Sequence, residues 1–165
     1  MPVKLGEGVP PLDLPLVSGG RFVLGDPPPD SFTVLVFYRG LHCRRCPGHL
    51  DAYRSLLGHF ENEGALVVAV SSDDRERAER AVADWGLDPL EVAYGFPLSA
   101  APDWGLHVTQ GKKAEDPAVF TEPALFVVDR EGRLDSAVIN AGPRLRAAPP
   151  DVLIHIRDRL AGEEA

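Results

Sequence analysis

The chain has 165 residues, of which 44% are hydrophobic and 25% charged, and its formal net charge is −8 at pH 7. This length suits one hydrophobic core, so we expect a single domain over residues 1–165. The negative charge argues against nucleic-acid binding, because the phosphate backbone would be repelled. Neither a long apolar run nor a basic start followed by an apolar stretch is present, so we expect no membrane span, no secretory signal and a cytoplasmic location.

The first elements predicted along the chain are a β-hairpin and a buried strand. Residues 10–24 alternate around the Ser-Gly-Gly at 18–20, which is typical of a hairpin, and the proline-rich stretch 25–31 is a loop. Residues 33–38 are β-branched or aromatic almost without a break. That run predicts a strand buried on both faces of a sheet.

The only two cysteines, Cys43 and Cys46, lie where this strand turns into a helix. Apolar side chains at helical spacing predict the helix: Leu50, Tyr53, Leu57 and Phe60. Pro47 favours the first helical turn and so places Cys46 beside the helix N-terminus. Free N–H groups, the positive end of the helix dipole and three nearby arginines all favour thiolate over thiol. We therefore predict a dithiol of low pKa.

The next predicted elements complete a β-α-β unit and add a second helix. Gly64 is the expected helix end, and residues 65–70 are a second buried strand. Ser71 with Asp74 resembles a capping box for a helix that Gly86 ends. The inner face of that helix carries Ala78, Ala81, Val82 and Trp85.

The remaining chain predicts a short helix, a second hairpin and a last helix. Residues 87–122 are expected to be irregular, apart from a short helix from Ser99 to Gly105. Strands at 124–129 and 134–139 flank a tight turn, and a helix begins near Pro150. The predicted class is α/β, a mixed central sheet with helices on both faces and an N-terminal β-hairpin.

This order, with a Cys-x-x-Cys at the strand-to-helix turn, resembles the thioredoxin fold. It is most similar to the longer form found in the AhpC/TSA family of peroxiredoxin-like redoxins. The resemblance runs from about residue 8 to residue 142. The matching residues are Phe37-Tyr38, Cys46-Pro47, Trp104-Gly105 and the strand Phe126 to Asp129 with Gly132.

The peroxiredoxin motif of this family is only partly present. The pattern Pro-x-x-x-Thr-x-x-Cys, aligned on Cys46, has Arg39 at its proline and Cys43 at its threonine. The family's catalytic arginine, at the head of the later strand, falls at Pro123. Arg39 or Arg44 would have to replace it.

Similarity to thioredoxin-type reductases implies a different use of the same residues. Pro123 resembles the cis-proline that faces the dithiol and opens a peptide edge to a partner polypeptide. In that interpretation Cys43 attacks a substrate disulfide and Cys46 resolves the mixed disulfide. Thioredoxins also carry a buried acid ahead of the cysteines, which residues 33–38 lack. Glu122 would take its place if it faces the sulfurs, and His42 and His49 are the other candidates.

The leading functional hypothesis is a thiol-disulfide oxidoreductase in cellular redox homeostasis, acting on protein or small-molecule disulfides. Because two arginines lie between its cysteines, the pair should be more oxidising than thioredoxin, whose reduction potential is about −270 mV. One alternative is an antioxidant thiol peroxidase in which Cys46 is peroxidatic and Cys43 resolves. Another is a copper- or zinc-binding redoxin that adds His42, His49 or His107 to the cysteines. A redoxin scaffold without turnover is the fourth.

The expected partners follow from the leading hypothesis and its peroxidase alternative. Disulfides or peroxides would be the substrates, and a thiol would supply electrons. We expect no cofactor, no metal in the site and no contact with nucleic acid or membrane. The resemblance also implies a homodimer, since relatives with this fold often pair.

Overall fold

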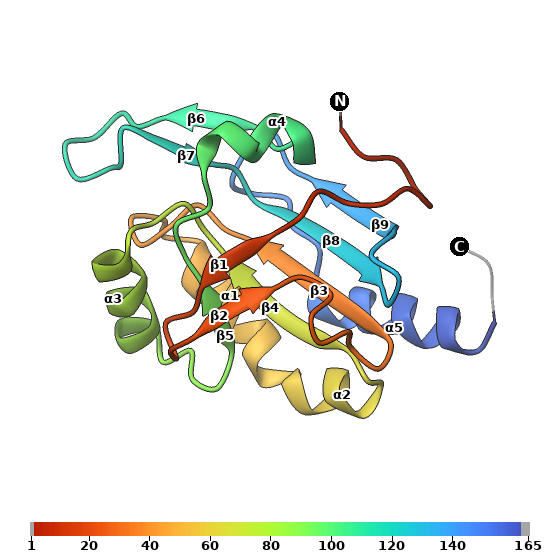
Figure 1. Cartoon of the computed structure of the whole chain (residues 1–165). Coiled ribbons are helices and arrows are strands. Elements are labelled where there is room, and N and C mark those ends of the chain that lie inside the picture. The colour runs from red at the N-terminus through yellow and green to blue at the C-terminus, as the bar shows by residue number, and fades with distance from the viewer. Residues whose placement is uncertain (1, 163–165) are drawn as a thin grey trace.

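The computed structural model describes residues 2–162 and has a five-stranded mixed sheet at its centre (Figure 1). The strand order is β5-β4-β3-β8-β9. The strands are β3 (Phe32–Phe37), β4 (Leu66–Val70), β5 (Glu91–Ala93), β8 (Ala124–Asp129) and β9 (Leu134–Ile139). β3, β4 and β5 are parallel, whereas β8 runs antiparallel to β3 and β9 antiparallel to β8. The predicted thioredoxin-like α/β class is confirmed. Residues 1 and 163–165 of the predicted domain lie outside the described part.

The central strand β3 is buried along its whole length because both faces of the sheet are covered. Val34 and Val36 pack in the core on one face, and Leu35 and Phe37 pack in the core on the other. This alternation is the period of two that a strand imposes on its side chains. An unbroken apolar run is therefore what this position requires.

The longer helices pack on one face of the sheet and the N-terminal hairpin on the other (Figure 1). The longer helices are α1 (Cys46–Ser55), α2 (Leu57–Asn62), α3 (Arg75–Trp85) and α5 (Pro149–Leu160). The second face is covered by β1 (Asp13–Pro15), β2 (Arg21–Val23), the 3-10 turn Leu98–Ala100 and the short helix α4 (Ala101–Trp104). Helices thus lie on both faces, as predicted.

Two local features differ from the sequence-based expectation. The helix predicted from Pro47 to Gly64 is two helices, α1 and α2, separated at Leu56. Asp74 alone caps α3, accepting a hydrogen bond from the Arg77 amide at 2.9 Å. Ser71, the expected cap, instead accepts from the amide of Asp73 at 3.2 Å.

The segment 87–122, expected to be irregular, contains three short strands. They are β5 and the two-stranded ribbon of β6 (Val108–Gln110) and β7 (Val119–Thr121). Each strand has only three residues, so the alternation of apolar and polar side chains is too short to be recognised in the sequence. Each becomes a strand through hydrogen bonds to its partner strand. This ribbon matters for the site, because Glu122 and Pro123 follow β7 directly.

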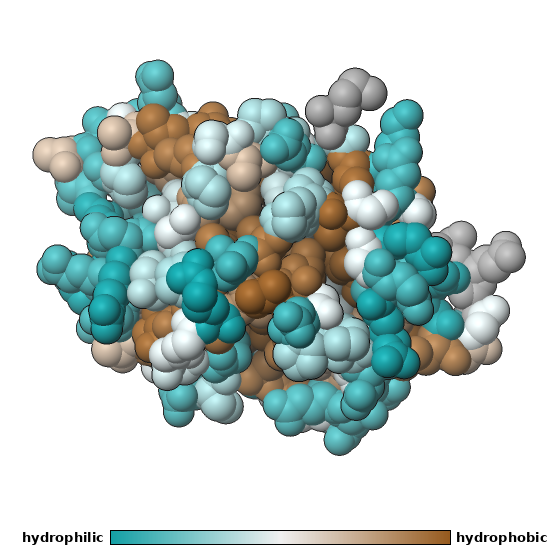
Figure 2. Space-filling view, viewed as in Figure 1, coloured by the Kyte–Doolittle hydropathy of each residue, from teal (hydrophilic) through white to brown (hydrophobic). Residues whose placement is uncertain are grey.

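The surface carries both apolar and hydrophilic side chains. Viewed over the N-terminal hairpin, apolar residues gather at the centre and hydrophilic residues surround them (Figure 2). Among the described residues, no helix is both long enough and apolar enough to cross a bilayer.

Candidate active site

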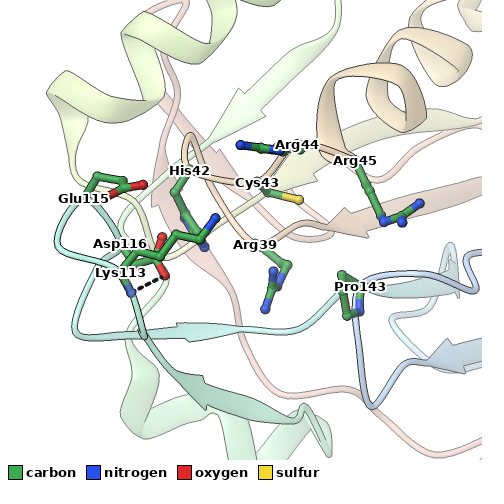
Figure 3. Close-up of a pocket in the computed structure, with 9 residues that line it drawn as sticks. All are labelled: Arg39, His42, Cys43, Arg44, Arg45, Lys113, Glu115, Asp116 and Pro143. Atoms are coloured by element: carbon green, nitrogen blue, oxygen red, sulfur yellow. Dashed lines mark hydrogen bonds between the residues drawn. The ribbon is translucent and has the colours of Figure 1, made fainter.

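Cys43 and Cys46 lie at the end of β3, where the chain turns into α1. Cys43 is in the turn and Cys46 is the first residue of the helix; both are free thiols. Cys43 is 4% exposed and Cys46 is 0% exposed. Cys43 also lines a pocket of about 220 Å³, and its sulfur points into the open space of that pocket (Figure 3). Of the two sulfurs, that of Cys43 is therefore the one a small molecule can reach.

One guanidinium group spans both sulfurs. Arg146 donates from one terminal nitrogen to Cys46 Sγ and from the other to Cys43 Sγ, both at 3.4 Å. Its third nitrogen, Nε, donates to the Pro143 carbonyl at 2.8 Å, which fixes the plane of the group. Arginine is suited to this task because its donors form a rigid fork with permanent charge. No sequence pattern indicated this residue, which lies 100 positions after Cys46.

The loop that carries Arg146 is attached to the cysteine helix. The carbonyl of Ala147 receives hydrogen bonds from His49 Nε2 at 3.0 Å and from the Tyr53 hydroxyl at 3.1 Å. Both donors belong to α1, the helix that begins at Cys46. Burial lowers the pKa of His49, which keeps its ring neutral. His49 therefore positions the loop and is not held against a sulfur.

The two thiols have opposite acidities. The pKa of Cys43 is lowered to about 5, mainly by a hydrogen bond from Cys46 and to a smaller extent by Arg146 and the Arg45 amide. Burial acts in the opposite direction. Burial, together with the charge on Cys43, raises the pKa of Cys46 well above its usual value. At neutral pH the pair is thus one thiolate, Cys43, and one thiol, Cys46. The predicted low-pKa dithiol is a single low-pKa sulfur with a protonated neighbour.

The turn before Cys43 is held by a buried carboxylate. Asp73 accepts a hydrogen bond from the Leu41 amide at 2.8 Å and is 3% exposed. Gly40 has φ +133°, and a Cβ there would lie 2.6 Å from Asp73 Oδ1. Only glycine allows this close approach. Burial raises the pKa of Asp73 to about 6.

Arg39 and Glu122 form a buried ion pair beside the pocket. Arg39 donates to Glu122 Oε1 at 3.0 Å, and Thr109 donates to the same oxygen at 3.1 Å. Arg39 also lies over the Phe120 ring, 4.6 Å from its centroid. The carboxylate of Glu122 is 2% exposed and is held by these two partners. Its hydrogen bonds therefore go to Arg39 and Thr109 and not to the sulfurs.

The structure also contains the other predicted site residues, in differing roles. His42 and Arg44 line the pocket beside Cys43. The His42 ring packs on Phe120 at 4.3 Å, and burial lowers its pKa, so it is neutral at pH 7. The expectation of a cis peptide bond before Pro123 is wrong: within residues 2–162 the cis bonds precede Pro27 and Pro89. Sequence reasoning placed this proline correctly at the head of β8, but the isomer depends on tertiary packing.

The surroundings of the cysteines bear on the metal-binding alternative. Within residues 2–162, no group of three or more histidine, cysteine, aspartate or glutamate side chains could hold a metal ion. Two sulfurs without further ligands do not make the four-coordinate site that zinc requires. None of His42, His49 and His107 therefore joins the two cysteines in a ligand group of the kind that was expected for a copper or zinc site.

Comparison with known proteins gives a consistent result. The model of the AhpC/TSA family matches residues 5–137. No curated protein sequence matches the chain. Peroxidoxin BcpB from Mycobacterium tuberculosis has a TM-score of 0.76 at 18% identity, covering 94% of this chain and 97% of that one. A cysteine-to-serine mutant of the peroxiredoxin 6 of Arenicola marina has a TM-score of 0.79 at 18% identity, covering 98% of this chain and 76% of that one. The reduced 2-Cys peroxiredoxin of Plasmodium vivax has a TM-score of 0.78 at 16% identity, covering 97% and 83%. These likenesses show the fold.

Proposed function

Because the chain belongs to the AhpC/TSA family of peroxiredoxin-like redox enzymes, we propose that it is a thiol peroxidase in which Cys43 attacks and Cys46 resolves. The observation that carries this proposal is the guanidinium of Arg146, 3.4 Å from each sulfur. After the hydrogen bond from Cys46, this guanidinium lowers the pKa of Cys43, and it is available to the negative charge that develops as a peroxide bond breaks.

The proposed reaction has two steps. The Cys43 thiolate attacks one oxygen of a hydroperoxide, the O–O bond breaks, and the other oxygen leaves as an alcohol or water after taking up a proton. Cys43 is then a sulfenic acid. The sulfur of Cys46 attacks it, a Cys43–Cys46 disulfide forms, and water leaves. A thiol donor must then return two electrons.

The order of attack reverses the peroxidase alternative considered from sequence, in which Cys46 reacts first. Cys46 is fully buried and its pKa is raised, so it is a protonated sulfur that peroxide cannot reach. Cys43 is the thiolate and faces the pocket. Its slight exposure suits a small electrophile better than the disulfide of a folded protein.

A thiol-disulfide oxidoreductase is the second candidate, favoured by the Cys-x-x-Cys with one acidic sulfur at the start of α1. The same Cys43 thiolate would attack a disulfide, and Cys46 would displace the mixed disulfide. Two residues that supported this function at the level of sequence do not have the expected geometry. The peptide bond before Pro123 is trans, and Glu122 is paired with Arg39. Small disulfides remain suitable substrates, because the pocket admits them.

Single-turnover kinetics on Cys43→Ser and Cys46→Ser test the proposal. Hydrogen peroxide should oxidise Cys46→Ser at the wild-type rate and leave a sulfenic acid that dimedone traps at Cys43, whereas Cys43→Ser should not react. Peroxide consumption that survives in Cys43→Ser and is lost in Cys46→Ser would reverse the assignment. Faster turnover of hydroxyethyl disulfide than of peroxide, by tenfold or more in kcat/KM, would favour the second candidate.

A further inference from the structure

The pocket beside Cys43 is the place where any molecule bonded to that sulfur must lie. It has a volume of about 220 Å³, enough for a small organic molecule. Cys46 does not line it and is fully buried. Thiol-disulfide exchange at this pair therefore passes through a mixed disulfide on Cys43, with the partner's substituent in the pocket.

The pocket is locally cationic in a chain whose formal net charge is −8. Four of its lining side chains carry positive charge, Arg39, Arg44, Arg45 and Lys113, against two negative ones, Glu115 and Asp116. Arg39 and Arg45 lie on the side of the sulfur, whereas both acids lie across the pocket (Figure 3). The charge near Cys43 thus favours an anionic group on a bound molecule.

Of the two arginines beside the sulfur, Arg39 and Arg45, only Arg39 is paired with a carboxylate. Arg39 is held by Glu122 at 3.0 Å and by the face of Phe120, so it is in position before anything binds. Arg45 is exposed, and within residues 2–162 no carboxylate lies within ion-pair distance of it. An arginine with no carboxylate partner beside a nucleophilic sulfur can bind a ligand carboxylate by a charge-assisted hydrogen bond.

We propose that the electron donor of this site is a small thiol bearing a carboxylate, which Arg45, with Arg39, holds while its sulfur reacts at Cys43. This inference rests on the proposed function, since it concerns the reduction of the Cys43–Cys46 disulfide. The donor thiolate attacks Cys43 Sγ, the bond between the cysteines breaks, and Cys46 leaves as a thiolate that takes up a proton. A second donor thiolate attacks the donor sulfur of the mixed disulfide. The donor disulfide leaves, and Cys43 is a thiolate again.

Arg146 assists both bond-breaking steps. Cys43 is uncharged in the mixed disulfide, so one cause of the raised pKa of Cys46 is absent, and Arg146 still lies beside Cys46. In the second step Cys43 is the leaving group. A sulfur of low pKa leaves faster, which suits its contact with the same guanidinium.

Reduction of the oxidised protein by thiols of graded charge tests the inference. The disulfide is first formed with one equivalent of hydrogen peroxide or of diamide. The probes are 3-mercaptopropionate, 2-mercaptoethanol and cysteamine, with each rate divided by the thiolate concentration and by the rate of the same thiolate with the uncharged 2-hydroxyethyl disulfide, which removes the difference in intrinsic nucleophilicity. The rate should rank in that order, and the advantage of 3-mercaptopropionate should shrink at high salt. In Arg45→Gln the ratio of the 3-mercaptopropionate rate to the 2-mercaptoethanol rate should fall about fivefold, as expected for one exposed ion pair.

The control is Arg130→Gln, in the turn between β8 and β9 at the opposite end of the sheet from the cysteines. It should leave the ratio unchanged. Equal rates for the three thiols, or a ratio unaltered in Arg45→Gln, would overturn the inference and leave the proposed function standing. If neither oxidant forms the disulfide, the proposed function itself fails, before any thiol is added.

Discussion

Replacing Arg146 by glutamine should raise the pKa of Cys43 and so lower the fraction of reactive thiolate at acid pH. The wild-type pKa is about 5, and Arg146 contributes to it by hydrogen bond and by charge, after the larger effect of the Cys46 thiol. An opposite charge at this range lowers a pKa by about 1 to 3. We take a rise of about 1.5 for the variant, since the hydrogen bond from Cys46 and the Arg45 amide remain.

The rise translates into a large effect at one pH and a small one at another. At pH 5 the thiolate fraction of Cys43 should fall from about one half to about 3%, so the midpoint of the alkylation profile with iodoacetamide should move from about pH 5 to about pH 6.5. At pH 8 both proteins are thiolate, and the variant should be somewhat faster, because a thiolate of higher pKa is the better nucleophile. The assay is the alkylation rate from pH 4 to 9, with the site of labelling identified by mass spectrometry.

The control and the refuting result are both specific. Arg144 is an exposed arginine of the same loop, two residues before Arg146, and it contacts neither sulfur. The control variant Arg144→Gln should therefore keep the wild-type dependence of the alkylation rate on pH. A titration midpoint in Arg146→Gln that coincides with the wild type would show that the guanidinium does not hold the thiolate. It would remove the main support for the proposed function.

Two further predictions concern the turn before Cys43. Gly40→Ala should destabilise the protein by about 2 kcal/mol or more, because φ is +133° and the new Cβ meets Asp73; Gly48→Ala, with open space in α1, should stabilise it by about 0.5 to 1 kcal/mol. Urea unfolding measures both, and equal stabilities would contradict the packing described. The folded pKa of Asp73, about 6, is raised above the usual 3.8, so its protonated form favours folding below about pH 4 and that contribution is lost as pH rises through 6. Asp73→Asn should remove about 2 to 3 kcal/mol of this pH dependence between pH 4 and 7, and an unchanged slope would reject the buried carboxylate as its source.

The sequence alone predicted the strand, the turn and the helix around Cys43 and Cys46, because each depends on neighbouring residues. The run at 33–38 is apolar on both sides of the strand and therefore belongs in the middle of a sheet. Pro47 and the helical spacing of apolar residues placed Cys46 at the start of α1. The resemblance to the AhpC/TSA family rested on the order of these local features, and the family match over residues 5–137 confirms it.

Only the tertiary structure decided that the two sulfurs differ in acidity. The guanidinium that contacts both sulfurs comes from Arg146, at the far end of the chain, and hydrogen bonds from α1 to Ala147 bring it there. The local arginines suggested the right chemistry, but not this source of charge. The acidity of a buried thiol depends on charges and donors within a few ångströms in space, and spacing along a sequence does not report those distances.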